Sequence, residues 1–147
     1  MIPLRYTLEH DDLDPPAYAH EGDAGFDLRA AVPEKGIMLT EASAPVWIPT
    51  GLRFDIPPGY ELQIRPRSGL SQFVRILNAP GTIDAGYIGE VKVLMHVQTN
   101  QYYRIKRNER IAQAVLAPVY RADLQPVSTI DKQTARGDGG FGSTGTE

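Results

Sequence analysis

Asp84 and Tyr87 lie on a glycine-rich stretch near the middle of the chain, residues 81–90, between two apolar, strand-like runs. A carboxylate at the rim of a hairpin can hold water or accept a proton, and the flanking strands would fix its position. Aspartate and glycine are also common turn residues, so a plain turn is the alternative interpretation of the same stretch.

A second group of reactive residue types lies near the C-terminus, where residues 136–145 include five glycines. Glycines let successive backbone N–H groups point the same way and form a concave anion site, to which Arg136, Ser143 and Thr144 add donors. Phe141 is the single large ring in this stretch and can stack on a base. The residue types are compatible with binding of a phosphate and a base, and also with a flexible solubilising tail.

Four more residues, in three segments of the chain, have side chains suited to a site. Arg67 and Ser68 follow a strand-like run, where a guanidinium, a hydroxyl and free amides form either a phosphate cradle or an ordinary helix cap. Asp27 is a lone acid between apolar residues, which fits an ion pair as well as a site role. Gln113 lies inside an apolar run, and this position indicates an inward polar contact. The three histidines show no ligand spacing, so we expect no metal site built by the protein.

The composition excludes several classes of protein. A chain of 147 residues suits one domain, and a net charge of -3 gives no basic surface for a nucleic-acid duplex. Without cysteine there is no disulfide, no thiolate zinc site and no cysteine nucleophile. No apolar run reaches the roughly 20 residues of a membrane helix, and the N-terminus lacks the layout of a signal peptide. We therefore expect a soluble, cytoplasmic protein without a membrane partner.

Twelve prolines and fourteen glycines cut the chain into short elements. Period-two alternation predicts strands over residues 2–8, 26–31, 36–40, 46–51, 52–56, 60–65, 91–97 and 111–119, with one helical turn over 68–73. Many short strands separated by turn residues are typical of an all-β barrel or sandwich. Beyond residue 125 large apolar side chains become rare, so we expect residues 126–147 to be mobile until something orders them.

Five segments, in this order along the chain, resemble the motifs of the trimeric dUTP diphosphatase (dUTPase) family. They are Ala24-Gly25-Phe26-Asp27-Leu28, Arg67-Ser68-Gly69-Leu70, the stretch from Asn78 to Glu90, Asn108-Glu109-Arg110-Ile111-Ala112-Gln113, and the stretch from Arg136 to Gly145. The resemblance runs from Pro3 to the glycine-rich C-terminal segment.

The resemblance implies a jelly-roll-like, β-clip barrel over residues 1–125 that forms a homotrimer with its active sites at subunit interfaces. Residues 126–147 would be a glycine-rich arm that closes over an active site of the trimer. The reaction implied is hydrolysis of dUTP to dUMP and diphosphate, which limits uracil in DNA and supplies dUMP for thymidylate synthesis. Mg²⁺ would be held by the substrate phosphates and water rather than by protein ligands.

The resemblance also implies a role for each motif residue. Asp84 would activate the water that attacks the α-phosphorus, Tyr87 would lie against the deoxyribose, and Asp27 would support the site. The nucleoside pocket would include Asn78, Gly81, Thr82, Ile83 and Lys92. The phosphates would be held by Arg67, Ser68, Gly69 and Gln113, with Arg136, Ser143 and Thr144 at the γ end. Phe141, followed by Gly142, would stack on uracil.

The chain departs from the family in the spacer 71–76, which is shorter than usual and lacks the lysine or histidine and the glycine often found there. Two alternatives to a dUTPase are a dCTP deaminase and a trimer that senses nucleotides without catalysis. A deaminase needs a glutamate at the amino group, and Glu90 is the acid available in the third motif. The complete glycine-rich arm favours the dUTPase.

Overall fold

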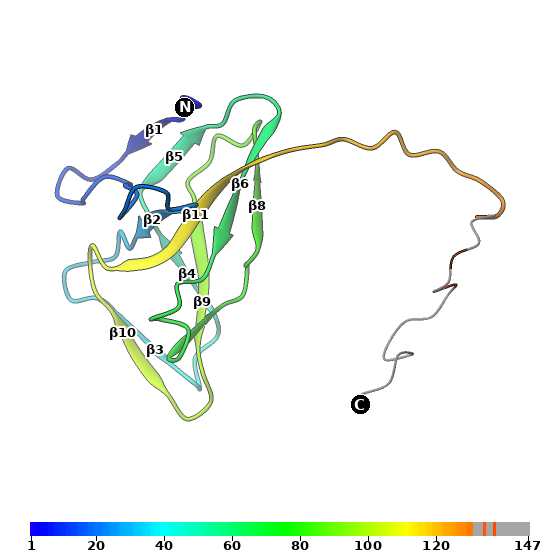
Figure 1. The fold of residues 1–147 in the computed structure, drawn as a ribbon. Helices are drawn as coiled ribbons and strands as arrows, with labels where there is room; N and C mark the ends of the chain where they lie inside the picture. Colours follow the sequence, from blue (N-terminus) through cyan, green and yellow to red (C-terminus); the bar gives the residue numbers. More distant parts are fainter. Residues whose placement is uncertain (131–133, 135–136, 138–147) are drawn as a thin grey trace.

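The computed structural model describes residues 1–130, 134 and 137, and every regular element in this part of the chain is a β-strand (Figure 1). The strands are β1 (Arg5–Leu8), β2 (Phe26–Arg29), β3 (Ile37–Thr40), β4 (Val46–Pro49), β5 (Leu52–Asp55), β6 (Tyr60–Arg65), β7 (Val74–Ile76), β8 (Gly81–Asp84), β9 (Lys92–Val97), β10 (Tyr102–Ile105) and β11 (Arg110–Pro118). The predicted all-β class is confirmed.

The strands form four antiparallel sheets. The largest has the order β2-β11-β6-β8, the next has β4-β9-β7, and the pairs β1-β5 and β3-β10 complete the set. Within the described residues these sheets surround one hydrophobic core but do not join into a single closed, hydrogen-bonded barrel. Strand β8 lies at the edge of the largest sheet, so it pairs with β6 on one side only.

Alternation of side chains explains why these segments pack as they do. On β9, Val93, Met95 and Val97 are buried, whereas Lys92 at the start of the strand is exposed. Strand β5 follows the same rule, with Leu52 buried and its neighbour exposed. One face of each strand therefore contributes apolar area to the core, at about 25 cal/mol for each Å² removed from water.

The structure corrects three details of the sequence interpretation. Gly81–Asp84 is a strand and not part of a turn, because its backbone pairs with Leu62 and its neighbours on β6. Strand β10 was not predicted, because its two adjacent tyrosines hide the alternation of apolar and polar residues, although Tyr103 and Ile105 do face inward. Residues 68–73 form hydrogen-bonded turns that include two helix-like bonds, from Ser71 N to Arg67 O and from Val74 N to Leu70 O, but no helix.

The chain leaves the packed body soon after β11. Val119 N–H donates to Gly59 O at 2.8 Å, and residues 118–130 are all exposed. Figure 1 shows this segment leading away from the sheets. The predicted division into a body of residues 1–125 and an arm of residues 126–147 stays a prediction.

Arg107 joins the long N-terminal loop to the turn before β11 through hydrogen bonds. Its guanidinium donates two hydrogen bonds to the Asp12 carboxylate, at 2.5 and 2.7 Å, and a third to Val32 O at 2.7 Å. The next residue, Asn108, has a φ of 61°, a conformation that asparagine tolerates better than most residues, and its Oδ1 accepts the N–H of Asp14 at 3.1 Å. The loop and the fourth motif are therefore held together.

The Asp12 pair makes stability depend on acid pH. The hydrogen bonds from Arg107 lower the pKa of Asp12 from 3.8 to about 2. Because the folded pKa is lowered, the pair stabilises the fold above about pH 4, and this contribution is lost as the pH falls toward 2. We expect Asp12→Asn to lower the Tm at neutral pH, and the difference from the parent to shrink between pH 4 and pH 2 in thermal denaturation. Asp11→Asn, at an exposed neighbour for which the described residues offer no ion pair, is the control; a Tm difference for Asp12→Asn that stays constant with pH would contradict the assignment.

Candidate functional site

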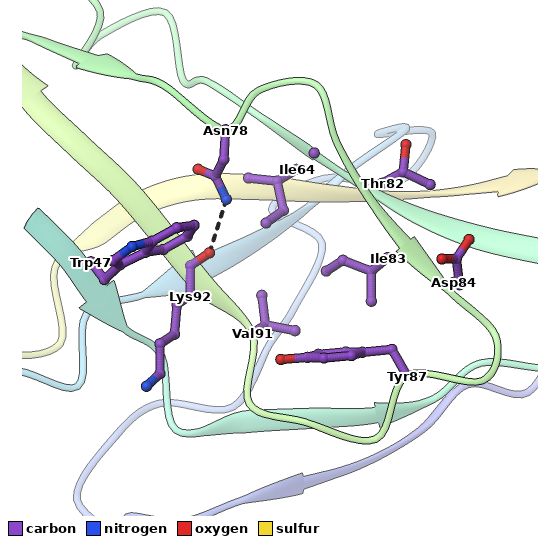
Figure 2. A pocket seen from close by; sticks show the side chains of 10 residues that line it. Trp47, Ile64, Asn78, Thr82, Ile83, Asp84, Tyr87, Val91 and Lys92 are labelled. Atoms are coloured by element: carbon purple, nitrogen blue, oxygen red, sulfur yellow. Dashed lines mark hydrogen bonds between the residues drawn. The ribbon is translucent and has the colours of Figure 1, made fainter. Parts of the chain in front are cut away.

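The larger of two pockets that contain predicted site residues, here called the hairpin pocket, is an open cavity of about 510 Å³ around β8, β9 and the loop that joins them (Figure 2). Its lining residues are Trp47, Ile64, Asn78, Gly81, Thr82, Ile83, Asp84, Tyr87, Val91 and Lys92. Asp84 and Tyr87 lie at one end of it, and Trp47, Asn78 and Lys92 lie at the other. Apolar walls with a few polar groups at the ends are typical of small-molecule sites.

Asp84 is the last residue of β8 and pairs with Glu61 on β6, so the ladder fixes its backbone. The residue is exposed, and within residues 1–130 no hydrogen bond or ion pair engages its carboxylate. A carboxylate held on a strand end with its oxygens free can orient a water molecule or accept a proton from it.

Asn78 forms hydrogen bonds to β9 at the end of the hairpin pocket away from Asp84. Its Nδ2 donates to Lys92 O at 3.1 Å, and its Oδ1 accepts the N–H of Leu94 at 2.8 Å. A Cβ on Gly81 would collide with the backbone carbonyl oxygen of Asn78, so this close approach requires glycine. Asn78 therefore positions the end of the pocket through β9, and only one N–H of its amide remains for a ligand.

Tyr87 forms one wall of the hairpin pocket from the loop after β8. Its hydroxyl donates to the main-chain oxygen of Glu90 at 3.0 Å, and 48% of the residue is exposed. In Figure 2 the ring faces Ile83 and Val91 across the cavity.

The smaller of the two pockets, here called the arginine pocket, has a volume of about 300 Å³ at the junction of β2, β11 and the turn after β6. It is lined by Ala19, Asp23, Ala24, Gly25, Asp27, Arg67, Ser68, Gly69 and Gln113. The Arg67 guanidinium, the Ser68 hydroxyl and nearby amides are donors, so this pocket suits an anion such as phosphate.

Asp27 orients the arginines of this pocket. Its carboxylate lies 2.9 Å from Nε of Arg67 and 3.4 Å from Nη1 of Arg110, with only 16% of the side chain exposed. Arg67 also donates to the main-chain oxygen of Arg110 at 3.3 Å. The ion pair expected of Asp27 is thus present, and it fixes where the guanidinium groups point.

Gln113 does make a polar contact, through Nε2 to Pro66 O at 3.0 Å. Space for its side chain depends on Gly25, because a Cβ there would lie 2.8 Å from Oε1 of Gln113. The amide of Gln113 therefore lies between Gly25 of the first motif and Pro66, which precedes the second motif.

Tyr103 connects the short spacer to the fourth motif, and sequence reasoning did not single it out. Its ring stacks on Phe73 with 5.7 Å between centroids, and its hydroxyl donates to Glu109 at 2.5 Å. Burial and this hydrogen bond raise the pKa of Tyr103 to about 12, so the phenol stays neutral. The sequence carries no local signal for this contact, because Phe73 and Tyr103 lie far apart along the chain.

The structure separates the predicted site residues into two groups. The third-motif residues and Lys92 line the hairpin pocket, whereas Asp27, Arg67, Ser68, Gly69 and Gln113 line the arginine pocket, and none of the described residues lines both. Sequence reasoning missed Trp47, which is 54% exposed on β4 at the rim of the hairpin pocket. Arg136, Phe141, Gly142, Ser143 and Thr144 lie outside the described residues.

No group of three or more histidine or acidic side chains that could hold a metal ion occurs in the described part of the chain. No helix in the same residues is long and apolar enough to cross a membrane.

Comparison with known proteins points to one family. A sequence model of the dUTPase family matches residues 11–145. The deoxyuridine 5'-triphosphate nucleotidohydrolase of Brucella melitensis biotype 2 is 52% identical over 142 residues, which cover 95% of this chain and 90% of the relative.

Solved structures agree. The dUTPase of Staphylococcus bacteriophage 80alpha with dUpNHpp superposes with a TM-score of 0.84 at 28% identity, over 99% of each chain. A mutant dUTPase from phage phi11 of S. aureus, described with a structural Mg(II) ion, has the same fold, with a TM-score of 0.75 at 23% identity over 89% of this chain and 100% of that one.

The contacts of Asp27 yield a stability prediction. Asp27→Asn leaves two guanidinium groups facing each other without a carboxylate, so we expect the free energy of unfolding to fall by about 1–2 kcal/mol, less than for a fully buried pair. Urea denaturation at a fixed protein concentration measures the change. Asp55→Asn, which breaks an exposed pair with Arg5, is the matched control and should cost less than about 1 kcal/mol. Equal effects of the two substitutions would show that Asp27 is an ordinary surface carboxylate.

Proposed function

Because this chain belongs to the dUTPase family, we propose that it hydrolyses dUTP to dUMP and diphosphate, with Asp84 as the catalytic carboxylate. The observation that carries the proposal is the order of groups along the hairpin pocket. The carboxylate at the end of the edge strand β8 and an aromatic wall lie at one end, and the start of β8 and the fixed amide of Asn78 lie at the other. A deoxynucleotide bound along the pocket would meet them in the order phosphate, sugar, base.

Asp84 would act on the water molecule that attacks the α-phosphorus. The carboxylate orients the water and accepts its proton while the water oxygen bonds to phosphorus. The bond from the α-phosphorus to the bridging oxygen then breaks, and diphosphate leaves with that oxygen. A carboxylate on a strand end suits this role because the ladder to β6 holds it against displacement.

Strand β8 offers the means to select the base. As the edge strand of its sheet in the described residues, it pairs with β6 on one side, and backbone N–H and C=O groups of its other side can meet a ligand. Uracil presents an acceptor, a donor and an acceptor along its pairing edge, which backbone groups can complement. The amino group of cytosine would meet another donor, and an unpaired buried donor costs about 1–3 kcal/mol.

The triphosphate carries several negative charges, and the arginine pocket supplies a guanidinium for them, whereas Lys92 of the hairpin pocket lies at the end away from Asp84. Arg67, Ser68, Gly69 and Gln113 are the donors of the arginine pocket. Since none of the described residues lines both pockets, we propose that the complete site joins the hairpin pocket of one subunit to the arginine pocket of another in a homotrimer. The arm, with Arg136, Phe141, Gly142, Ser143 and Thr144, would close over that site.

In this arrangement Mg²⁺ would be bound by the substrate and not by protein ligands. The two carboxylates that line the arginine pocket are already engaged, because Asp27 pairs with two arginines and Asp23 accepts the N–H of His20 at 2.9 Å. The oxygens of the triphosphate and of water would therefore be the ligands of the ion. When bound there, Mg²⁺ would neutralise charge on the phosphates and fix their conformation.

Glu90 argues against the deaminase alternative. Its Oε1 accepts the N–H of Gly51 at 2.9 Å, its Oε2 lies 3.4 Å from Nζ of Lys92, and it does not line the hairpin pocket. A carboxylate engaged in this way cannot also serve as the acid and base at a substrate amino group.

Hydrolysis of dUTP in the cytoplasm would keep uracil out of DNA and supply dUMP for thymidylate synthesis.

The test of the proposed function is diphosphate release from dUTP, dCTP, dTTP and UTP, each with Mg²⁺. We expect fast release from dUTP alone. Binding of dUTP without release would favour the sensing trimer over the enzyme, and release from dCTP as well would overturn the assignment of the base.

Asp84→Asn separates catalysis from binding. The amide cannot accept the proton of water, so we expect turnover of dUTP to fall by about 10²–10⁴-fold while the affinity for a non-hydrolysable dUTP analogue stays within a few-fold. Steady-state kinetics and calorimetry give the two numbers. Glu61→Gln, at the cross-strand partner of Asp84, is the matched control and should keep turnover. An Asp84→Asn enzyme with the turnover of the parent would remove Asp84 from the mechanism.

A further inference from the structure

The ring of Tyr87 needs support from outside itself. Nearly half of the residue is exposed, so packing leaves the ring free to swing unless a polar contact holds it. That contact is the hydrogen bond from the hydroxyl to the main-chain oxygen of Glu90. The position of the ring therefore depends on how firmly Glu90 itself is held.

Gly89 gives the ring its space. A Cβ at this position would lie 2.5 Å from Cζ and 2.9 Å from Cε2 of Tyr87, far inside van der Waals contact. Because the obstructed group is the end of a half-exposed side chain, an added methyl group would displace the ring and leave the backbone in place. Gly86, in the same loop, has no atom within 4 Å of the point that a Cβ would occupy and no left-handed φ, so it can accept alanine.

Glu90 is anchored through its side chain to the turn between β4 and β5. The carboxylate accepts the N–H of Gly51 at 2.9 Å and pairs with Lys92, and only 15% of the side chain is exposed. The turn is itself rigid, because Thr50 is buried and its hydroxyl donates to Val91 O at 2.7 Å. The oxygen that holds the Tyr87 hydroxyl is thus fixed to the core.

We propose that Gly89 and Glu90 are positioning residues that set the selectivity for deoxyribose over ribose by fixing the ring of Tyr87. The inference rests on the proposed function, in which this ring lies against the sugar and leaves no room for a 2′-hydroxyl. A shift of the ring by a fraction of an ångström opens that room and weakens its contact with deoxyribose. Neither residue touches the substrate in this arrangement; both act through Tyr87.

The test compares dUTP with UTP. We expect Gly89→Ala and Glu90→Ala each to lower the ratio of kcat/KM for dUTP over UTP by about tenfold or more, mainly through KM for dUTP. Binding of dUMP and UMP, measured by calorimetry, should show the same loss of discrimination. Because dUMP binding needs no chemistry, this readout judges the inference even if dUTP is not hydrolysed.

Two matched controls separate positioning from stability. Gly86→Ala adds the same methyl group to the same loop without meeting the ring. Glu41→Ala removes a carboxylate that likewise accepts a backbone N–H, that of Asn100 at 2.9 Å, far from Tyr87 in sequence. Both controls should keep the parental ratio of dUTP to UTP, whatever they do to Tm.

A double-mutant cycle tests whether Glu90 acts on selectivity through the hydroxyl of Tyr87. Tyr87→Phe removes the hydroxyl that Glu90 holds, so we expect the combination Tyr87→Phe with Glu90→Ala to lose no more selectivity than the worse single variant. Additive losses, or a lower Tm for Gly89→Ala and Glu90→Ala with the parental ratio unchanged, would overturn the inference. A parent that binds dUMP over UMP but does not cleave dUTP would overturn the proposed hydrolysis alone, and a parent that binds neither would overturn both.

Discussion

The buried hydroxyl of Thr50 joins the turn between β4 and β5 to the segment that carries the rim of the hairpin pocket. It donates to Val91 O and accepts the N–H of Leu52, so both of its hydrogen-bonding functions are used inside the core. A buried hydroxyl without partners would cost about 1–3 kcal/mol, which makes this geometry strongly preferred. The Glu90 carboxylate on Gly51, and through it Tyr87, depend on this turn.

The two pockets have opposite chemistry. The hairpin pocket offers a free carboxylate and an edge strand, whereas the arginine pocket offers donors oriented by one partly buried aspartate. Because Asp84 and Arg67 lie in separate pockets, no guanidinium among the described residues holds the oxygens of the Asp84 carboxylate. In the trimer that we propose, the substrate itself would connect the two chemistries, and the phosphates would lie between acid and arginine only when bound.

The short spacer after the second motif has its own support. Phe73 stacks on Tyr103, and Tyr103 donates to Glu109, whose other oxygen accepts the N–H of Lys106 at 2.8 Å. The turn that follows Arg67 is therefore braced against the residue before Arg110, and both arginines meet at Asp27. The stacking of Phe73 on Tyr103 thus supports the turn after Arg67, although the spacer that forms this turn is short.

The sequence alone determined the all-β class, most strand positions and the members of each motif, because period-two alternation and the order of the motifs are local properties of the chain. It did not reveal that Gly81–Asp84 is a strand, because glycine and aspartate are also common turn residues. It did not reveal Tyr102–Ile105 either, because two adjacent tyrosines interrupt the alternation of apolar and polar residues. Only the tertiary structure decided which motif residues share a pocket and that the Glu90 carboxylate holds the β4–β5 turn. Those facts depend on hydrogen bonds and ion pairs between distant segments, such as Asp27 with Arg67 and Gly51 with Glu90, for which no local pattern encodes the partner.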